Sequence, residues 1–138
     1  MIHKVYAYVV RKEQHEKQLL VFEHVNMSEA GIQVPKGTVE RDEDWAAAVL
    51  RELAEETGLQ HASIVRFLTS DYEELEGERI NRHFYLLAVD EAQDEWLYEP
   101  KGHAEEQQKL TFKCYWINED ELDRIVKPMG DYAYLAFR

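Results

Sequence analysis

The stretch from residue 42 to residue 59 constrains this chain most, because it joins a strong helix pattern to an unusual placement of charge. Residues 45–56 contain no glycine or proline and are rich in alanine, leucine, glutamate and arginine, which favour helices. Asp42 is the expected N-cap, and Gly58 stands where a helix commonly ends in the left-handed conformation. The sequence therefore predicts a helix over residues 45–56.

Two sides of this predicted helix differ in character. At about 100° per residue, a largely apolar stripe forms on one side from Ala46, Leu50, Leu53 and Thr57. Glu52, Glu55 and Glu56 gather on another side, because residues three and four apart are neighbours on a helix. These carboxylates repel one another near the C-terminus, where the helix dipole is also negative. A hard divalent cation, Mg²⁺ or Mn²⁺, would neutralise them, and the alternative is a solvated acidic face.

The acidic cluster belongs to a longer pattern that resembles the sequence box of the Nudix hydrolase family. That box is a glycine, five residues, a glutamate, seven residues, and then Arg-Glu-apolar-x-Glu-Glu-x-Gly-apolar. The chain meets every defined position without a gap, with Gly37, Glu43, Arg51, Glu52, Leu53, Glu55, Glu56, Gly58 and Leu59. The resemblance implies an α/β (α+β) fold, a Nudix-like α/β/α sandwich with a mixed sheet between helices. It also implies hydrolysis of a diphosphate bond.

The box residues suggest roles for such a reaction. Glu52, Glu55 and Glu56 would hold one or more Mg²⁺ or Mn²⁺ ions, and one of them, with Glu52 the first candidate, would take a proton from water. The resemblance supports this set without fixing which glutamate is the base. Gly37 would permit a tight turn that presents its backbone carbonyl to the metal. Arg51 would form an ion pair with a box carboxylate such as Glu43 and hold the loop against the helix.

Three residues outside the box core are further candidates. Lys36 would contact a substrate phosphate, and the alternative is an ordinary surface lysine. Nudix enzymes often use an additional glutamate from a loop before the last strand, and Glu105 and Glu106 stand in that position here. In so acidic a loop, solvated charge is the alternative for both.

Composition narrows the class of protein. The chain of 138 residues carries a net charge of −12, which argues against a partner that is a nucleic acid polymer, because such proteins need a basic surface. No segment is long and apolar enough to span a bilayer, and the start of the chain does not resemble a signal peptide. We therefore expect a single domain over residues 1–138, cytoplasmic, monomeric or homodimeric, with a small nucleotide as its partner.

The rest of the chain reads mainly as strands. Alternating or continuous apolar and aromatic residues predict strands over 3–11, 18–24, 62–72, 79–89 and 110–117, with a further short strand possible over 38–40. The first two strands, and also the third and fourth, are expected to form hairpins. Residues 90–107 are predicted to be a long surface loop. Asn118 and Asp131 are expected to cap two short C-terminal helices.

Two functions are consistent with these observations. The first is a Mg²⁺-dependent hydrolase of a nucleoside diphosphate linked to another group, such as a nucleoside triphosphate or a dinucleoside polyphosphate. The second is a non-catalytic sensor that binds a nucleotide without cleaving it. The complete set of carboxylates favours the enzyme. The segment 35–37 resembles the one before the box in dinucleoside polyphosphate hydrolases, and oxidised nucleoside triphosphates, nucleotide sugars and ADP-ribose remain open as substrates.

Overall fold

The computed structural model describes residues 1–13, 15–91, 93–100 and 110–138. Within these residues the strands form one seven-stranded sheet in the order β4-β5-β1-β2-β7-β6, and β3 pairs separately with β1. The strands are β1 (Ile2–Glu13), β2 (Glu16–His24), β3 (Lys36–Thr38), β4 (Ser63–Leu75), β5 (Glu78–Ala88), β6 (Glu95–Tyr98) and β7 (Phe112–Ile117). The helical segments are η1 (Ser28–Ala30), α1 (Trp45–Thr57), η2 (Glu119–Arg124) and η3 (Ala133–Phe137).

The sheet is mixed because its two long central strands run parallel. β1 pairs with β5 in parallel and with β2 and β3 antiparallel, and β4 pairs with β5 antiparallel. A central strand of this kind is covered on both faces, so its sequence is a continuous apolar run rather than an alternation. The segment of β1 from Val5 to Val10 fits this rule, since every side chain in it is buried.

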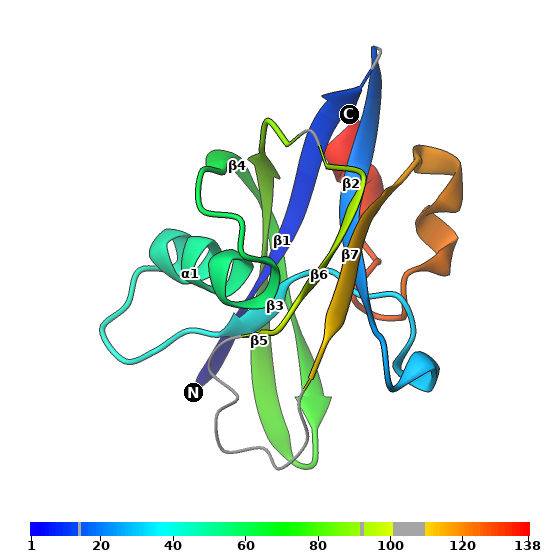
Figure 1. Ribbon diagram of the computed structural model, residues 1–138. Helices are drawn as coiled ribbons and strands as arrows, with labels where there is room; N and C mark the ends of the chain where they lie inside the picture. Colours follow the sequence, from blue (N-terminus) through cyan, green and yellow to red (C-terminus); the bar gives the residue numbers. More distant parts are fainter. Residues whose placement is uncertain (14, 92, 101–109) are drawn as a thin grey trace.

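Each face of the sheet is covered by its own core. Because successive side chains point to opposite faces, Val5, Ala7 and Val9 pack toward α1, whereas Tyr6 and Tyr8 pack on the other side. The second core includes residues of η3 and the segment before it, and the Tyr8 hydroxyl donates a hydrogen bond of 2.6 Å to the Met129 carbonyl. In Figure 1, α1 lies on one side of the strands and the C-terminal helical turns lie on the other.

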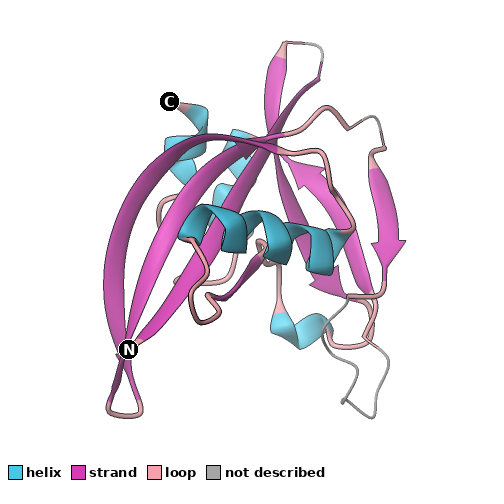
Figure 2. Cartoon of the chain, turned by 90° about the vertical axis from the view of Figure 1, so that its left-hand side faces the viewer, coloured by secondary structure: helices cyan, strands magenta, loops and turns pink. Residues whose placement is uncertain are grey.

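This layering confirms the predicted fold class. The helical layer at the C-terminus nevertheless consists of short 3₁₀ turns, η2 and η3, so α1 is the one α-helix among the described residues. Figure 2 shows α1 lying across the strands of the sheet. No helix in the described ranges is long and apolar enough to cross a membrane.

Most of the predicted strands are present. β1 with β2 and β4 with β5 form antiparallel pairs, as expected for the two hairpins. The further short strand is β3, which covers Lys36–Thr38 rather than residues 38–40. The prediction of an unstructured loop over residues 90–107 is wrong for part of that range, because Glu95–Tyr98 forms β6, which pairs with β7 at the sheet edge. Its four residues are too few for a periodic pattern to stand out.

The helix prediction needs two corrections. The N-cap is Asp44 in an extended conformation, and Asp42 lies in the preceding turn with φ at +63°. The buried side of α1 is made by Ala48, Val49, Leu53 and Thr57, whereas Leu50 remains 36% exposed. The buried side of the helix is therefore rotated relative to the predicted stripe.

Candidate active site

Gly37 and Glu52 form the contact between β3 and α1. Gly37 pairs with Val5 within the sheet, and a Cβ added to it would lie 1.9 Å from the Glu52 carboxyl carbon. The expectation that Gly37 makes a tight turn is wrong, since it occupies a strand and its φ is not in the left-handed region. Glycine is needed here because the Glu52 carboxylate fills the space a side chain would take.

Arg51 lies at the centre of an array of carboxylates. Its guanidinium contacts Glu43 at 2.7 Å, Glu52 at 2.8 Å, Glu40 at 3.1 Å and Glu55 at 3.2 Å. A further hydrogen bond of 3.1 Å goes to the Thr38 carbonyl just after Gly37. The expected ion pair between Arg51 and Glu43 is therefore present.

Arg51 also affects the pKa values of the carboxylates that it contacts. Two hydrogen bonds from Arg51 lower the pKa of Glu43 to about 2, because they favour the charged carboxylate. For Glu52, burial outweighs the guanidinium and raises the pKa. Glu43 therefore stays charged at neutral pH and ties the loop to Arg51. The charged form of Glu52, in contrast, is disfavoured by its burial.

Glu56 is the most perturbed carboxylate of the site. Burial raises its pKa to about 8, and the neighbouring Glu52 and Glu55 add to this effect. Its side chain accepts a hydrogen bond of 2.8 Å from the Lys36 backbone N–H, so it faces β3 rather than solvent. A buried carboxylate with a raised pKa and like charges beside it is a frequent sign of a functional site.

The lysine beside Glu56 lies close to the other face of the sheet. The Lys36 ammonium is 5.9 Å from the centre of the Tyr6 ring, and burial lowers its pKa. Its backbone contact with Glu56 connects the segment before the box directly to the helix. Tyr6, Phe84 and Tyr8 are no more than 2% exposed, as expected for core aromatics.

The chemistry of these donors fits a hard divalent cation. In the described part of the chain no three histidine, cysteine or acidic side chains are grouped as an ion would require, and Arg51 donates hydrogen bonds to Glu52 and Glu55. The set nonetheless presents carboxylate oxygens, the ligands that Mg²⁺ and Mn²⁺ prefer, and its buried charge is incompletely neutralised. Glu105 and Glu106 lie outside the described residues.

Sequence reasoning missed two contacts at the ends of α1. At its N-terminus, Trp45 stacks on His83 with ring centres 3.5 Å apart, and His83 is hydrogen-bonded to Ser70 and His3. At its C-terminus, Trp96 of β6 donates a hydrogen bond to the Thr57 carbonyl. The sequence held no periodic signal for the second contact, because Trp96, Leu97 and Tyr98 are successive apolar residues and only their burial in the structure alternates.

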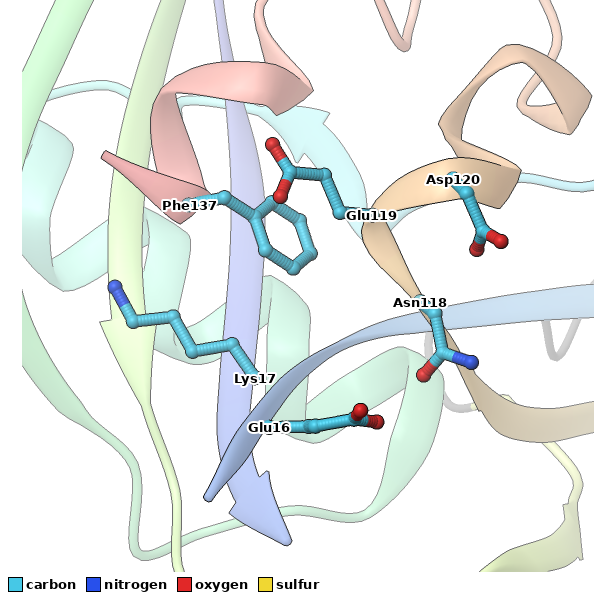
Figure 3. A pocket seen from close by; sticks show the side chains of 6 residues that line it. All are labelled: Glu16, Lys17, Asn118, Glu119, Asp120 and Phe137. Atoms are coloured by element: carbon cyan, nitrogen blue, oxygen red, sulfur yellow. The ribbon is translucent and has the colours of Figure 1, made fainter.

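Two of the hollows on the described surface lie at different distances from the box. One of about 600 Å³ lies where the start of β2 meets η2 and η3, and Figure 3 shows charged side chains of both signs around the Phe137 ring there. Its lining residues are Glu16, Lys17, Asn118, Glu119, Asp120 and Phe137. A second hollow, of about 430 Å³, includes Glu43 and Trp45 at the start of α1. The second hollow therefore adjoins the box at Glu43, whereas the first lies at the other helical layer.

Known structures share this architecture. A C. elegans Ap4A hydrolase complex matches with a TM-score of 0.65 at 16% identity, covering 99% of this chain and 91% of that one. The MutT protein from Methanosarcina mazei Go1 matches with a TM-score of 0.65 at 20% identity, covering 99% and 93%. The NUDIX domain of Shewanella oneidensis NrtR, in complex with ADP ribose, matches with a TM-score of 0.63 at 14% identity, covering 99% and 84%.

The sequence comparisons are more specific than these shared folds. A search of curated protein sequences finds no match to this chain. The family model described as NUDIX domain, however, matches residues 1–135, which is nearly the whole chain and contains every box residue described above. This protein therefore belongs to the Nudix family.

Proposed function

We propose that this protein is a Mg²⁺-dependent hydrolase, built as a single domain over residues 1–138, that cleaves a diphosphate bond in a nucleoside diphosphate linked to another moiety. The observation that carries the proposal is the carboxylate array on α1. Glu52, Glu55 and Glu56 are crowded at the negative end of the helix, and burial raises the pKa of Glu52 and Glu56. A chain selected only for folding would gain by replacing one of them.

The residues have distinct tasks in this proposal. Glu52, Glu55 and Glu56, with the Gly37 carbonyl, would hold Mg²⁺ or Mn²⁺. When bound, the cation supplies neutralising charge for the diphosphate and a more acidic water. Glu52 is the first candidate for the base that takes the water proton as the water oxygen attacks phosphorus and the bridging P–O bond breaks.

Two positively charged residues support this chemistry. Arg51 would keep Glu43 and the loop after β3 in place through the contacts given above, while releasing Glu52 and Glu55 to the cation. Lys36 would contact a substrate phosphate; its backbone N–H donates to Glu56, and its half-buried ammonium lies 5.9 Å from the centre of the Tyr6 ring. The net charge of −12 makes such local cations necessary for an anionic substrate to approach.

For the substrate, we propose a nucleoside triphosphate or a dinucleoside polyphosphate. The printed names of two structural neighbours, an Ap4A hydrolase and a MutT protein, are consistent with this class. The segment 35–37, which precedes the box, points in the same direction.

A second candidate function is that of a non-catalytic nucleotide sensor. It is favoured by the NrtR domain, which has this fold and binds ADP ribose in its complex. The complete box and the two strained carboxylates favour the enzyme instead.

A panel of nucleotides incubated with purified protein and Mg²⁺, with products resolved by chromatography, tests the proposal. We expect cleavage of at least one nucleoside diphosphate derivative, no turnover in excess EDTA, and recovery when Mg²⁺ or Mn²⁺ is restored. The Glu52→Gln variant is the negative control, and the exposed Glu29→Gln variant is the charge-matched positive control. Binding without cleavage in all conditions would favour the sensor, and full turnover in EDTA would overturn the role of the metal.

A further inference from the structure

β6 meets the C-terminal end of α1. The Trp96 indole N–H donates a hydrogen bond of 2.8 Å to the Thr57 carbonyl, although the two residues are 39 positions apart in sequence. The neighbouring Gly58 lies so close to the Tyr98 ring that an added Cβ would come within 2.7 Å of it. In Figure 1, β6 runs between α1 and β7.

The hydrogen bond from Trp96 reaches the end of α1 at which backbone carbonyls lack hydrogen-bond donors within the helix. The last carbonyls of an α-helix have no partner within the helix, and a buried carbonyl without a donor is costly. Thr57 is 1% exposed, so water is not an adequate partner for its carbonyl. The Trp96 N–H supplies the donor, and its dipole opposes the negative end of α1 next to Glu55 and Glu56.

Trp96 is itself held in place by contacts with β7. It pairs with Cys114 of β7, and its ring lies 6.3 Å from that of Trp116. The Trp116 indole donates to the Gln93 carbonyl at 3.0 Å, and the guanidinium of buried Arg11 lies 4.5 Å from the Trp116 ring. The donor to Thr57 is thus fixed by the sheet rather than free to follow the helix.

From these contacts we infer that Trp96 and Tyr98 are positioning residues for the carboxylate array. They hold the last turn of α1, and with it Glu55 and Glu56, at one distance from β3. No hydrogen bond or ion pair joins either residue to Glu55 or Glu56 in the described part of the chain, so their effect passes through the helix backbone. The link to metal binding rests on the proposed function, whereas the link to the helix turn does not.

Hydrogen exchange of the metal-free protein tests the helix part of the inference. Trp96→Phe keeps a ring but removes the N–H donor to α1, and Trp116→Phe likewise keeps a ring but removes the donor to Gln93, which is not a hydrogen bond to α1. We expect the amides of residues 55–58 to exchange about tenfold faster in Trp96→Phe than in the wild type, the scale of one lost hydrogen bond. Equal exchange in Trp96→Phe and Trp116→Phe, at matched global stability, would overturn the inference.

A second pair of variants tests the same inference independently, in case the Trp96→Phe protein does not fold. Tyr98→Ala removes the ring that packs on Gly58, whereas Leu97→Ala removes a neighbouring side chain that is 67% exposed and serves as its control. The same local increase in exchange is expected for Tyr98→Ala and not for Leu97→Ala. If both behave like the wild type, the packing of β6 on α1 does not position the turn.

Titration with Mn²⁺ alone, followed by calorimetry, tests the link to the metal. We expect Kd to rise by about fivefold or more in Trp96→Phe and to stay at the wild-type value in Trp116→Phe, because misplaced ligands bind an ion less well. Faster exchange with an unchanged Kd would reduce the role of Trp96 to structure only. If the wild-type protein binds no Mn²⁺, the proposed function and the link to metal both fail, and the exchange comparison still decides whether Trp96 fixes the turn.

Discussion

Gly37 and Glu52 are in such close contact that a single added carbon on Gly37 would lie 1.9 Å from the carboxyl carbon of Glu52. These residues join β3 to α1 across 15 positions of sequence. The crowded atoms on the α1 side belong to the end of a flexible side chain, whereas those on the β3 side are backbone. A substitution at Gly37 will therefore move the carboxylate before it moves the strand.

For Gly37→Ala we expect loss of activity without loss of the fold. The melting temperature should stay within a few degrees of the wild type, while kcat/KM falls about a hundredfold, the scale for misplacing a reacting group by an ångström. A double-mutant cycle with Glu52→Gln provides the control. If Gly37→Ala acts through Glu52, it adds little in the Glu52→Gln background, and fully additive effects would contradict this route.

Replacing Glu56 should separate stability from activity. The folded pKa of Glu56 is about 8 against an ordinary 4.5, so between these pH values the folded state keeps a proton that the unfolded state loses, and the stability of the metal-free wild type falls as pH rises from 4.5 to 8. Glu56→Gln can still accept the Lys36 N–H but carries no charge. Its melting temperature in EDTA should equal that of the wild type near pH 4.5 and exceed it at pH 8, while kcat falls about a hundredfold.

Melting curves at a series of pH values, with Glu29→Gln as a variant that loses one exposed charge, check this expectation. A gain in stability that is the same at every pH would show that the pKa of Glu56 is not raised in the folded protein. Wild-type turnover in Glu56→Gln would remove it from the site.

Glu43→Gln should show the opposite dependence on pH. Arg51 lowers the pKa of Glu43 to about 2, so its contribution to stability is complete above about 4.5 and disappears as pH falls toward 2. At pH 7 we expect the variant to be less stable by about 1–2 kcal/mol, the scale of a hydrogen bond to a charged group. Chemical denaturation at pH 7 and pH 3 measures this difference, and a loss that persists unchanged at low pH would contradict the ion-pair explanation.

Glu105 and Glu106 are tested by alanine variants made singly and together. If either assists the reaction, its removal should lower kcat about tenfold or more at an unchanged melting temperature, the scale for a base or a water-positioning group. Wild-type kcat and Mg²⁺ dependence in the double variant would leave the α1 carboxylates as the complete set.

Sequence alone was sufficient for the features that depend on neighbouring residues. The α1 helix, its end at Gly58, the two hairpins and the ion pair of Arg51 with Glu43 were all predicted, because periodicity, turn residues and box spacing are local signals. The N-cap was misplaced by two residues, from Asp44 to Asp42, since helix boundaries are set by weak preferences that tertiary contacts override.

Tertiary structure decided which way these elements face and what they touch. The predicted stripe left Leu50 buried, yet Leu50 is exposed, because the rotation of a helix is fixed by the sheet on which it packs and not by its own sequence. Likewise the Lys36 N–H reaches Glu56, and the Trp96 N–H reaches Thr57, across 20 and 39 positions. These hydrogen bonds form only when strands distant in sequence, β3 and β6, pack against α1. The sequence therefore determined which carboxylates stand together on α1, whereas the fold decided how deeply each is buried and hence how far its pKa is moved.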